Sequence, residues 1–270
     1  MKELNGREIA DFVKERQAKA VRGLRQQWKV QPKLAIIRTN PDPVVDSYMK
    51  LKQRYGDDIL VDVEVHTIDQ SEALDLIHKL NSDDTVHGII VQIPLPNRSQ
   101  TDEILAAVSP DKDVDGLSGK AAFDAATPLA IIWLLAGYDI DLQNRIVLVV
   151  GKGRLVGAPL IKMFENSGIF PLHADRETEN LSELTRRADV IICATGVPGV
   201  IKADMVKPNA IIVDAGVATD TNGLVGDVDP SVRELPDITI TPIKGGVGPL
   251  TVAALFENVI TAARRAASKD

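Results

Sequence analysis

Three glycines follow a short apolar run near the middle of the chain. Gly151, Gly153 and Gly157 come directly after the aliphatic residues 146–150, and an apolar helical pattern starts at Val156. A strand, a glycine turn and a helix in this order bring a pyrophosphate against backbone N–H groups at a helix N-terminus. The spacing G-x-G-x-x-x-G is one residue longer than the commonest dinucleotide fingerprint, and a structural turn in any α/β protein could also have it. The residues after later strands are therefore what favours a dinucleotide site.

Candidate cofactor contacts also follow the later predicted strands. Asp175 lies near the position where an acidic residue binds a ribose 2′-hydroxyl, whereas Lys152 and Arg176 could bind a 2′-phosphate. A solvated loop is the alternative for Asp175 and Arg176. Two cations against one anion favour NADP, with NAD as the other possibility. The predicted cofactor contacts are Gly151, Lys152, Gly153, Val156, Gly157, Asp175, Arg176, Thr195, Gly196, Gly216 and Val217.

The first half of the chain has no glycine cradle, but it carries four polar residues that could do chemistry. Tyr48 and Lys52 are one helical turn apart in a helical pattern, so they share one face of that helix. Gln92 stands in an apolar strand, where a polar amide needs hydrogen-bond partners, and Asp115 lies in a charged turn. A solvated helix lysine and ordinary Asp-Gly turn chemistry are the alternatives for Lys52 and Asp115.

Other kinds of catalytic centre lack the residues that they need. No cluster of Cys, His, Asp and Glu has the spacing of a metal site, and no serine lies in a nucleophile elbow. The one cysteine, Cys193, lies in an apolar strand pattern that is typical of a small core residue. The sequence therefore predicts no metal.

The bulk properties narrow the class of protein. The chain has 270 residues, a net charge of −7 and 44% apolar residues, which suits a soluble enzyme of two modest domains. The negative charge argues against a nucleic-acid or anionic-membrane partner. No apolar run reaches the ~18 residues of a membrane span. A single cysteine and an N-terminus without an apolar signal region indicate a cytoplasmic location.

Alternating strands and helices are expected to position these residues. In the first region we expect strands at 33–38, 61–67 and 86–93 and helices at 6–28, 43–60, 71–81 and 102–108. In the second region we expect strands at 145–150, 170–173, 190–195, 210–214 and 238–241, with helices between most of them. Such alternation implies parallel sheets with right-handed crossovers.

The fold class that follows is α/β with two domains. An N-terminal αβα domain is followed by a Rossmann-like, doubly wound parallel sheet. Residues 1–122 and the C-terminal helix 250–270 are assigned to the first domain, and residues 123–249 to the second. A nearly all-apolar helix, 127–136, is expected between the domains.

Five motifs occur in order along the chain. They are Val91-Gln-Ile-Pro-Leu-Pro96, Asp111-Lys-Asp-Val-Asp-Gly116, Gly157-Ala-Pro159, Val225-Gly-Asp-Val-Asp229 and Thr241-Pro-Ile-Lys-Gly-Gly-Val-Gly-Pro-Leu-Thr251. Together they resemble the bifunctional methylenetetrahydrofolate dehydrogenase/methenyltetrahydrofolate cyclohydrolase family. The similarity runs over nearly the whole chain, and the glycine-rich last motif is the most specific. Chance agreement of all five in the family's order is implausible.

The resemblance implies two reactions and a set of residues for them. The chain would oxidise 5,10-methylenetetrahydrofolate with NADP and then hydrolyse the methenyl product to 10-formyltetrahydrofolate. Lys52 matches the family's catalytic lysine, and Gln92 matches the glutamine that contacts it. Tyr48 and Asp115 match residues that line the folate site and hold the pterin. Gly246 and Pro249 belong to the loop that borders the cleft, and are expected to contact substrate.

The resemblance also implies a setting for these reactions. The family is typically homodimeric through its dinucleotide domain, with a cleft between that domain and an N-terminal substrate domain. It serves one-carbon metabolism and purine biosynthesis. Apolar residues of the segment 200–206 have no obvious internal task, so we expect this segment in the dimer contact.

Several residues depart from the family pattern. Lys152-Gly153 stands where the family usually has arginine-serine, and Ala174 replaces a serine often used near the 2′-phosphate. The segment between Gly116 and Thr127 is shorter than the family's. None of these changes removes a proposed catalytic group.

Two functions of other classes explain part of the sequence. Another nicotinamide enzyme, such as a shikimate or amino-acid dehydrogenase, would leave Gln92, Asp115 and the loop 245–249 unexplained together. A dinucleotide-binding sensor without catalysis would leave the pair Tyr48 and Lys52 without a task.

Overall fold

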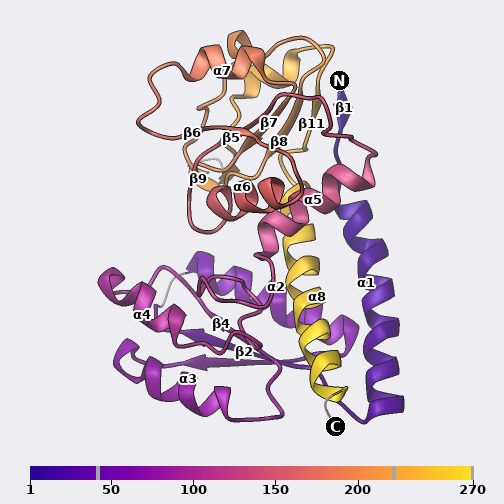
Figure 1. Ribbon diagram of the computed structural model, residues 1–270, viewed down its shortest axis with the longest axis vertical. Helices are drawn as coiled ribbons and strands as arrows, with labels where there is room; N and C mark the ends of the chain where they lie inside the picture. The colour runs from indigo at the N-terminus through magenta and orange to yellow at the C-terminus, as the bar shows by residue number, and fades with distance from the viewer. Residues whose placement is uncertain (41–42, 221–222, 269–270) are drawn as a thin grey trace. The chain divides into compact units, whose positions relative to one another are not determined.

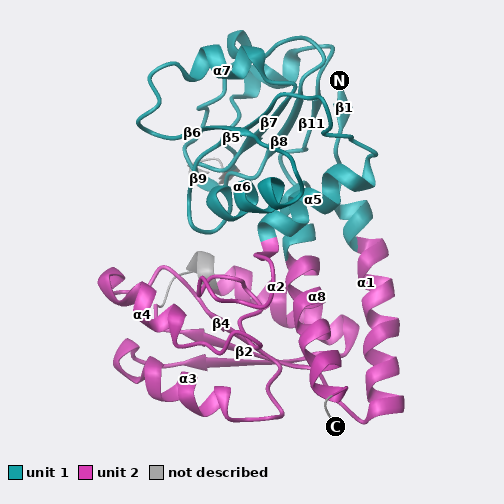
Figure 2. Cartoon of the chain, in the orientation of Figure 1, with its two compact units in different colours: residues 1–10, 127–251 teal, residues 11–126, 252–270 magenta. Residues whose placement is uncertain are grey.

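The chain folds into two compact units in which strands and helices alternate along the sequence (Figure 1). The computed structural model describes residues 1–40, 43–220 and 223–268. Unit 1 comprises Met1–Ala10 and Thr127–Thr251, and unit 2 comprises Asp11–Ala126 and Val252–Asp270, as Figure 2 shows.

Unit 2 is built around a three-stranded parallel sheet in the order β3-β2-β4. Its strands are β2 (Lys33–Arg38), β3 (Asp62–Thr67) and β4 (Gly88–Val91). The four middle residues of β2 are buried because a strand lies on each side and other side chains cover both faces. The edge strand β3 alternates exposed and half-buried residues over most of its length, as its alternating sequence predicts.

Helices complete unit 2. They are α2 (Pro43–Ile59), α3 (Ala73–Asn81) and α4 (Thr101–Ala106), with most of α1 (Gly6–Gly23) and of α8 (Val247–Ala267). A π-helical turn, Leu24–Trp28, extends α1, so the helix expected at 6–28 is present. Short 3-10 turns, Gln70–Glu72 and Arg98–Gln100, precede α3 and α4.

An apolar core joins the sheet of unit 2 to α3 and α4. Its fully buried members include Ala35, Ile37, Ile77, Ile89 and Ile104. Each large aliphatic side chain buried in this way contributes roughly 1.5–3 kcal/mol to folding. This core fixes where β2 and β4 end.

Unit 1 contains a six-stranded parallel sheet in the order β1-β11-β8-β7-β5-β6. Its strands are β1 (Lys2–Glu3), β5 (Val147–Val150), β6 (Leu172–Ala174), β7 (Val190–Cys193), β8 (Ile211–Asp214) and β11 (Thr239–Ile240). Its helices are α5 (Ala126–Gly137), α6 (Gly157–Asn166) and α7 (Leu181–Arg187), with 3-10 turns at Ala203–Met205 and Pro230–Glu234. An antiparallel pair, β9 (Ala218–Asp220) and β10 (Gly223–Val225), follows β8.

The two parallel sheets confirm the predicted α/β class, with a Rossmann-like sheet in the second half of the chain. Each strand expected between 145 and 241 is present, and most are shorter than expected. The sequence missed β1 and the pair β9–β10.

The first ten residues belong to unit 1, although the sequence assigned them to the first domain. β1 pairs in parallel with β11, with Lys2 opposite Thr239. The Asn5 N–H donates to the Tyr138 hydroxyl at 2.7 Å. These contacts involve residues that are far apart in the sequence, so no local pattern predicts them.

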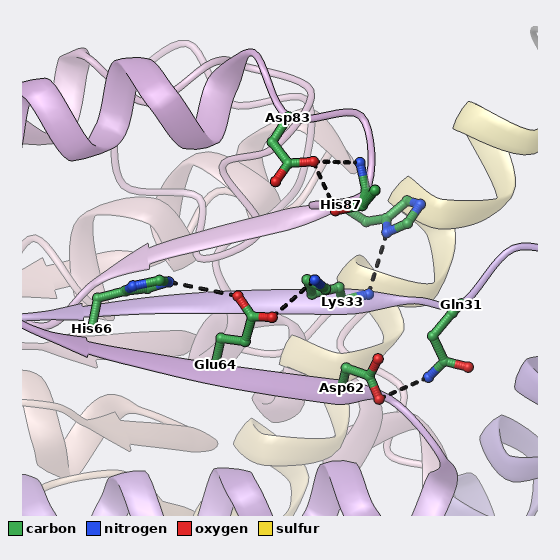
Figure 3. A network of polar contacts seen from close by, with 8 residues as sticks. Gln31, Lys33, Asp62, Glu64, His66, Asp83 and His87 are labelled. Atoms are coloured by element: carbon green, nitrogen blue, oxygen red, sulfur yellow. Dashed lines mark hydrogen bonds and ion pairs between the residues drawn. The ribbon is translucent and has the colours of Figure 1, made fainter.

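A polar network surrounds the amino ends of the strands in unit 2 (Figure 3). His87 closes the pairing of β2 with β4, because its N–H donates to the Lys33 carbonyl and its Nδ1 accepts the Lys33 N–H at 3.2 Å. The Lys33 ammonium pairs with Glu64 at 2.8 Å. Burial lowers the pKa of the His87 imidazole, and the nearby Lys112 and Lys33 lower it further while Asp83 opposes them. The buried imidazole is therefore neutral, with Nδ1 as an acceptor.

His87 should make stability depend on pH. Because its pKa is lowered in the folded chain, its contribution is present above the ordinary histidine pKa of ~6.5 and is lost as pH falls below that value. We expect the free energy of unfolding, measured with urea, to drop less between pH 8 and pH 5 in His87→Gln than in the wild type. His78→Gln, which changes an exposed histidine on α3, is the control and should keep the wild-type drop. An unchanged drop in His87→Gln would contradict the assignment.

Candidate functional site

Lys52 and Gln92 meet at the carboxyl end of the sheet in unit 2. Lys52 lies on α2, and its Nζ donates to Gln92 Oε1 at 3.2 Å. Gln92 directly follows β4, and its backbone N–H donates to the Ile37 carbonyl at 2.9 Å, which continues the pairing with β2. Its side-chain NH₂ donates to the Ile93 carbonyl at 3.2 Å. The amide is therefore oriented with its oxygen toward the lysine.

Asp115 is held by a turn that Asp113 organises. The buried Asp113 carboxylate accepts the backbone N–H groups of Gly116 at 3.0 Å and Ser118 at 2.8 Å. From α8, Asn258 Nδ2 donates to the Val114 carbonyl at 2.9 Å. The turn is thus fixed on both sides of Asp115.

Lys112 fixes the start of the same turn. Its ammonium donates to the carbonyls of Leu80, Asn81 and Asp83, at 3.0, 2.9 and 2.7 Å, where α3 ends. Cations at helix C-termini satisfy carbonyls that have no partner within the helix. Lys112 and Asp113 belong to the motif 111–116 but were not singled out from the sequence. Their place in that motif was the only feature of the sequence that could have indicated a role for them.

The surroundings of Lys52 disfavour its charge. Burial lowers the pKa of the Lys52 ammonium, and the negative charge of Asp115 opposes this effect. Burial raises the pKa of the Asp115 carboxyl, Lys52 opposes that rise, and Asp113 adds to it. Both groups are half-buried by exposed area. An amine whose protonated form is destabilised is a better proton acceptor near neutral pH.

Three further residues were predicted to contact substrate. Tyr48 is one turn before Lys52 on α2, with its side chain 40% exposed. Gly246 and Pro249 belong to unit 1, where Gly246 is buried and Pro249 lies in the first turn of α8. Within unit 2 the structure thus brings together Lys52 and Gln92, with Asp115 as the nearby charge.

The glycine turn of unit 1 joins β5 to α6 as predicted. Gly151 has φ +98°, a conformation that favours glycine, and a Cβ there would lie 2.5 Å from the Ala194 carbonyl oxygen. A Cβ at Gly157 would lie 1.7 Å from the Gly151 carbonyl oxygen, so helix and strand pack as closely as expected. Val156, predicted as a cofactor contact, is the half-buried residue before α6.

Gly153 is required by neither packing nor conformation. A Cβ there would meet nothing within 4 Å. Gly153 is exposed and comes shortly before α6, and the free space beside it leaves room for a phosphate to approach the backbone near the helix N-terminus. The cradle therefore fits the pyrophosphate of a dinucleotide.

Lys152, Asp175 and Arg176 are exposed at the carboxyl ends of β5 and β6. Lys152 Nζ and Asp175 Oδ2 are 4.0 Å apart, so the lysine partly neutralises the acid. Asp175 also accepts the Glu177 N–H at 3.1 Å, which orders the loop. Such a loop presents two cations and one paired carboxylate.

The loops after β7 and β8 carry the remaining predicted cofactor contacts. Gly196 has φ +69°, and the Thr195 hydroxyl accepts the Val197 N–H at 3.0 Å. Gly216 is half-buried, and Val217 is 51% exposed. The neighbouring strands β5, β7 and β8 therefore bring Thr195, Gly196, Gly216 and Val217 to the edge of the sheet where Gly151 lies.

Two further observations concern the described residues as a whole. No group of three His, Cys, Asp or Glu side chains among residues 1–40, 43–220 and 223–268 is placed to hold a metal ion. Over the same residues, no helix combines the length and the apolar character that crossing a bilayer requires.

Known proteins resemble the chain over almost its whole length. A bifunctional protein FolD of Exiguobacterium sibiricum is 36% identical over 275 residues, which cover 97% of this chain and 99% of that protein. The crystal structure of FolD, a methylenetetrahydrofolate dehydrogenase/cyclohydrolase, from Campylobacter jejuni has a TM-score of 0.93 and 34% identity, and the match covers 98% and 99% of the two chains. The Trypanosoma brucei enzyme, solved with NADP and an inhibitor, has a TM-score of 0.90 and 26% identity, with coverage of 97% and 96%.

Family models match both halves of the chain. The catalytic-domain model of the tetrahydrofolate dehydrogenase/cyclohydrolase family matches residues 4–115, and its NAD(P)-binding-domain model matches residues 125–267. These matches favour the family indicated by the motifs over a different dehydrogenase or a non-catalytic sensor. The chain therefore belongs to the tetrahydrofolate dehydrogenase/cyclohydrolase family.

Proposed function

We propose that this chain oxidises 5,10-methylenetetrahydrofolate with NADP and hydrolyses the methenyl product to 10-formyltetrahydrofolate. The observation that carries the proposal is the group of Lys52, Gln92 and Asp115 in unit 2. Burial lowers the pKa of the lysine, and the amide of Gln92 fixes its Nζ. A different dehydrogenase would have no evident use for this arrangement. The direct test is NADP reduction with methylenetetrahydrofolate, followed by the disappearance of the methenyl product.

NADP fits the residues of unit 1. It would accept a hydride from the methylene carbon of the folate. Gly151, Gly153 and Gly157 would receive the pyrophosphate at the N-terminus of α6, and Lys152 with Arg176 would bind the 2′-phosphate. Positioning of the two reactants is the main contribution that a protein makes to such a transfer.

The hydrolytic step needs a proton acceptor. Water adds to the methenyl carbon as one of its protons goes to the Lys52 amine, which gives a neutral hydroxy adduct. The bond from that carbon to N5 then breaks while the hydroxyl becomes the formyl carbonyl, and the proton that the hydroxyl loses goes to N5. A cationic methenyl group beside Lys52 would disfavour the ammonium form still further. Gln92 holds the amine in place, and Asp115 is available to hold the pterin through hydrogen bonds.

Replacing Lys52 should abolish hydrolysis and leave dinucleotide binding intact. The loss in Lys52→Met should be at least the ~10²–10⁴-fold typical of a positioned acid–base group. Lys52→Arg should fail nearly as badly, because a guanidinium stays protonated. The rates are measured by following methenyltetrahydrofolate in the absence of NADP, and binding by calorimetry.

A neighbouring lysine supplies the control for this experiment. Lys50→Met changes an exposed lysine on the same helix and should hydrolyse at the wild-type rate. Near-wild-type hydrolysis in both Lys52 variants would remove Lys52 from the mechanism. Dehydrogenase activity is also expected to fall if Lys52 orients the folate.

Cofactor choice should depend on the pair Lys152 and Asp175. Lys152→Ala removes a charged contact worth roughly 1.5–3 kcal/mol and leaves Asp175 unpaired, so NADP should bind about tenfold or more weakly while NAD is spared. Asp175→Asn should act in the opposite sense, because it removes the charge that repels the 2′-phosphate and that strengthens a hydrogen bond from the 2′-hydroxyl. Dissociation constants for both cofactors decide the matter. If Lys152→Ala weakened the binding of NADP and NAD equally, Lys152 would contact the pyrophosphate that both cofactors share, or no part of the cofactor.

We propose that unit 1 pairs with a second copy, but through a different surface from the one expected. The segment 200–206 does not offer an apolar surface, because Ile201 and Met205 are buried and Val200 and Val206 pack against the core of unit 1. The premise that these apolar residues have no internal task was therefore wrong. The edge strand β6 is a better candidate, since Phe170, two residues before it, is 80% exposed.

A charge at position 170 should therefore weaken the dimer. We expect the wild type to sediment as a dimer at micromolar concentration and Phe170→Asp to sediment as a monomer. Phe12→Asp is the matched control, because Phe12 is 71% exposed on α1 and does not border a sheet edge. A monomeric wild type, or a Phe170→Asp dimer as tight as the wild type, would refute this proposal.

Other assignments depend on the family resemblance alone. Gly246 and Pro249 as folate contacts stay predictions. The cytoplasmic location and the role in purine biosynthesis stay predictions as well.

A further inference from the structure

Two aspartates in unit 1 bind the backbone of the loops after β7 and β8. Asp214 is the last residue of β8, and Asp227 belongs to the motif 225–229, which has no task in the proposed reaction. Asp214 is half-buried, and Asp227 is completely buried. A carboxylate is costly to bury, so its presence in a core requires specific partners.

Asp227 fixes the loop after β7. Its Oδ2 accepts the Thr195 N–H at 2.5 Å. Its own main chain is anchored, because its carbonyl accepts the Ile201 N–H at 3.2 Å and the Ile201 carbonyl accepts the Asp229 N–H at 2.8 Å. Hydrogen bonds to a carboxylate are stronger than those to a neutral acceptor. The position of Thr195 and the following Gly196 thus depends on Asp227.

Asp214 connects the loop after β8 to the same motif. Its Oδ1 accepts the N–H groups of Gly216 at 3.1 Å and Asp227 at 3.0 Å, and its Oδ2 accepts the Val228 N–H at 3.1 Å. Burial raises the pKa of the Asp214 carboxyl, the backbone donors of Asp227 and Val228 oppose this, and the charge of Asp227 adds to the rise. The loops after β7 and β8 are thus connected to each other through Asp227 and Asp214.

Gly216 is a glycine because Asp227 occupies the space of its side chain. A Cβ on Gly216 would lie 1.9 Å from Asp227 Oδ1. Similarly, a Cβ on Gly226 would lie 2.0 Å from Asp214 Oδ2. Asp227 Oδ1 has no hydrogen-bond partner among the described residues. From the sequence, Gly216 was interpreted as a place where the cofactor approaches closely. The structure adds a second, steric reason for a glycine at this position.

A dinucleotide bound to unit 1 would have its nicotinamide half at these two loops. The proposed ribose contact Asp175 follows β6, and the proposed pyrophosphate cradle follows β5. Since the order of strands is β8-β7-β5-β6, the other half of the molecule extends to the carboxyl ends of β7 and β8. Thr195 and Gly216 stand at those ends.

We propose that Asp227, with Asp214, is a positioning pair for the nicotinamide half of the dinucleotide. The pair holds the 195–197 loop against the 215–217 loop, so that both meet the cofactor with their backbone already ordered. Asp227 acts through Thr195 and Gly216 and touches no ligand, because its carboxylate is fully buried. The identity of the ligand rests on the proposed function, whereas the ordering of the loops does not.

The test compares cofactor binding with an activity that needs no cofactor. Asp227→Ala should weaken NADP binding about tenfold or more in calorimetry, and Asp227→Asn by less, because an amide oxygen can still accept the Thr195 N–H. Hydrolysis of methenyltetrahydrofolate without NADP should stay at the wild-type rate in both variants. Amide hydrogen exchange at Thr195 should be slow in the wild type and fast in Asp227→Ala.

Two further variants separate positioning from general destabilisation. Asp229→Asn changes an acid of the same motif whose carboxylate accepts the Ser231 N–H at 2.9 Å, and it should bind NADP as the wild type does. Gly216→Ala should weaken NADP binding because its Cβ displaces Asp227. In the double variant Asp227→Ala/Gly216→Ala, NADP should bind almost as well as in Asp227→Ala alone, since the carboxylate that the Cβ would displace is already absent.

Each outcome decides the proposal. NADP binding within about twofold of the wild type in Asp227→Ala, or fast exchange at Thr195 already in the wild type, would overturn it. A parallel loss of hydrolysis and NADP binding in Asp227→Ala would indicate misfolding, and Asp227→Asn then decides. Weakened NADP binding with normal hydrolysis in Asp227→Asn would support the proposal, and any other result would overturn it. A wild type that binds NADP without oxidising methylenetetrahydrofolate would refute the proposed function and leave the binding comparison intact.

Discussion

The amine of Lys52 is held where burial disfavours its positive charge, and the chemistry proposed for unit 2 depends on that. Burial lowers its pKa, while Asp115 limits the effect. Its hydrogen-bond partner is the neutral amide of Gln92. An amide oxygen accepts a hydrogen bond from an amine as well as from an ammonium. It therefore orients Lys52 without strongly favouring the protonated form. A carboxylate at the same distance would favour the ammonium strongly and oppose proton uptake.

Parallel strands impose the second constraint, because their carboxyl ends meet at one edge of each sheet. Unit 2 uses this edge for Gln92 beside α2, and unit 1 uses it for the glycine turn and the two loops beyond it. In both units a buried aspartate then holds the functional loop by its backbone. Asp113 accepts N–H groups around Asp115, and Asp227 accepts the N–H of Thr195. The residues proposed to contact a ligand thus depend on buried side chains that hold their backbone.

The sequence predicted those features that local pattern and residue type determine. Apolar runs marked β2, β5 and β8, and a glutamine in an apolar strand correctly called for a partner, which is Lys52. Features that depend on distant residues were missed. β1 has two residues and pairs only because β11 is beside it. The buried side of the segment 200–206 was mistaken for surface, since apolar residues in an irregular segment do not reveal which side they face.

Direct titration of the Lys52 amine, by nuclear magnetic resonance of the intact chain without ligands, tests the central claim. The lysine signal is assigned by its absence in Lys52→Arg. We predict a pKa below the ordinary value for lysine in the wild type, because burial outweighs Asp115, and a further decrease in Asp115→Asn. A wild-type pKa at or above the ordinary value for lysine would contradict the proposed role of Lys52 as a proton acceptor.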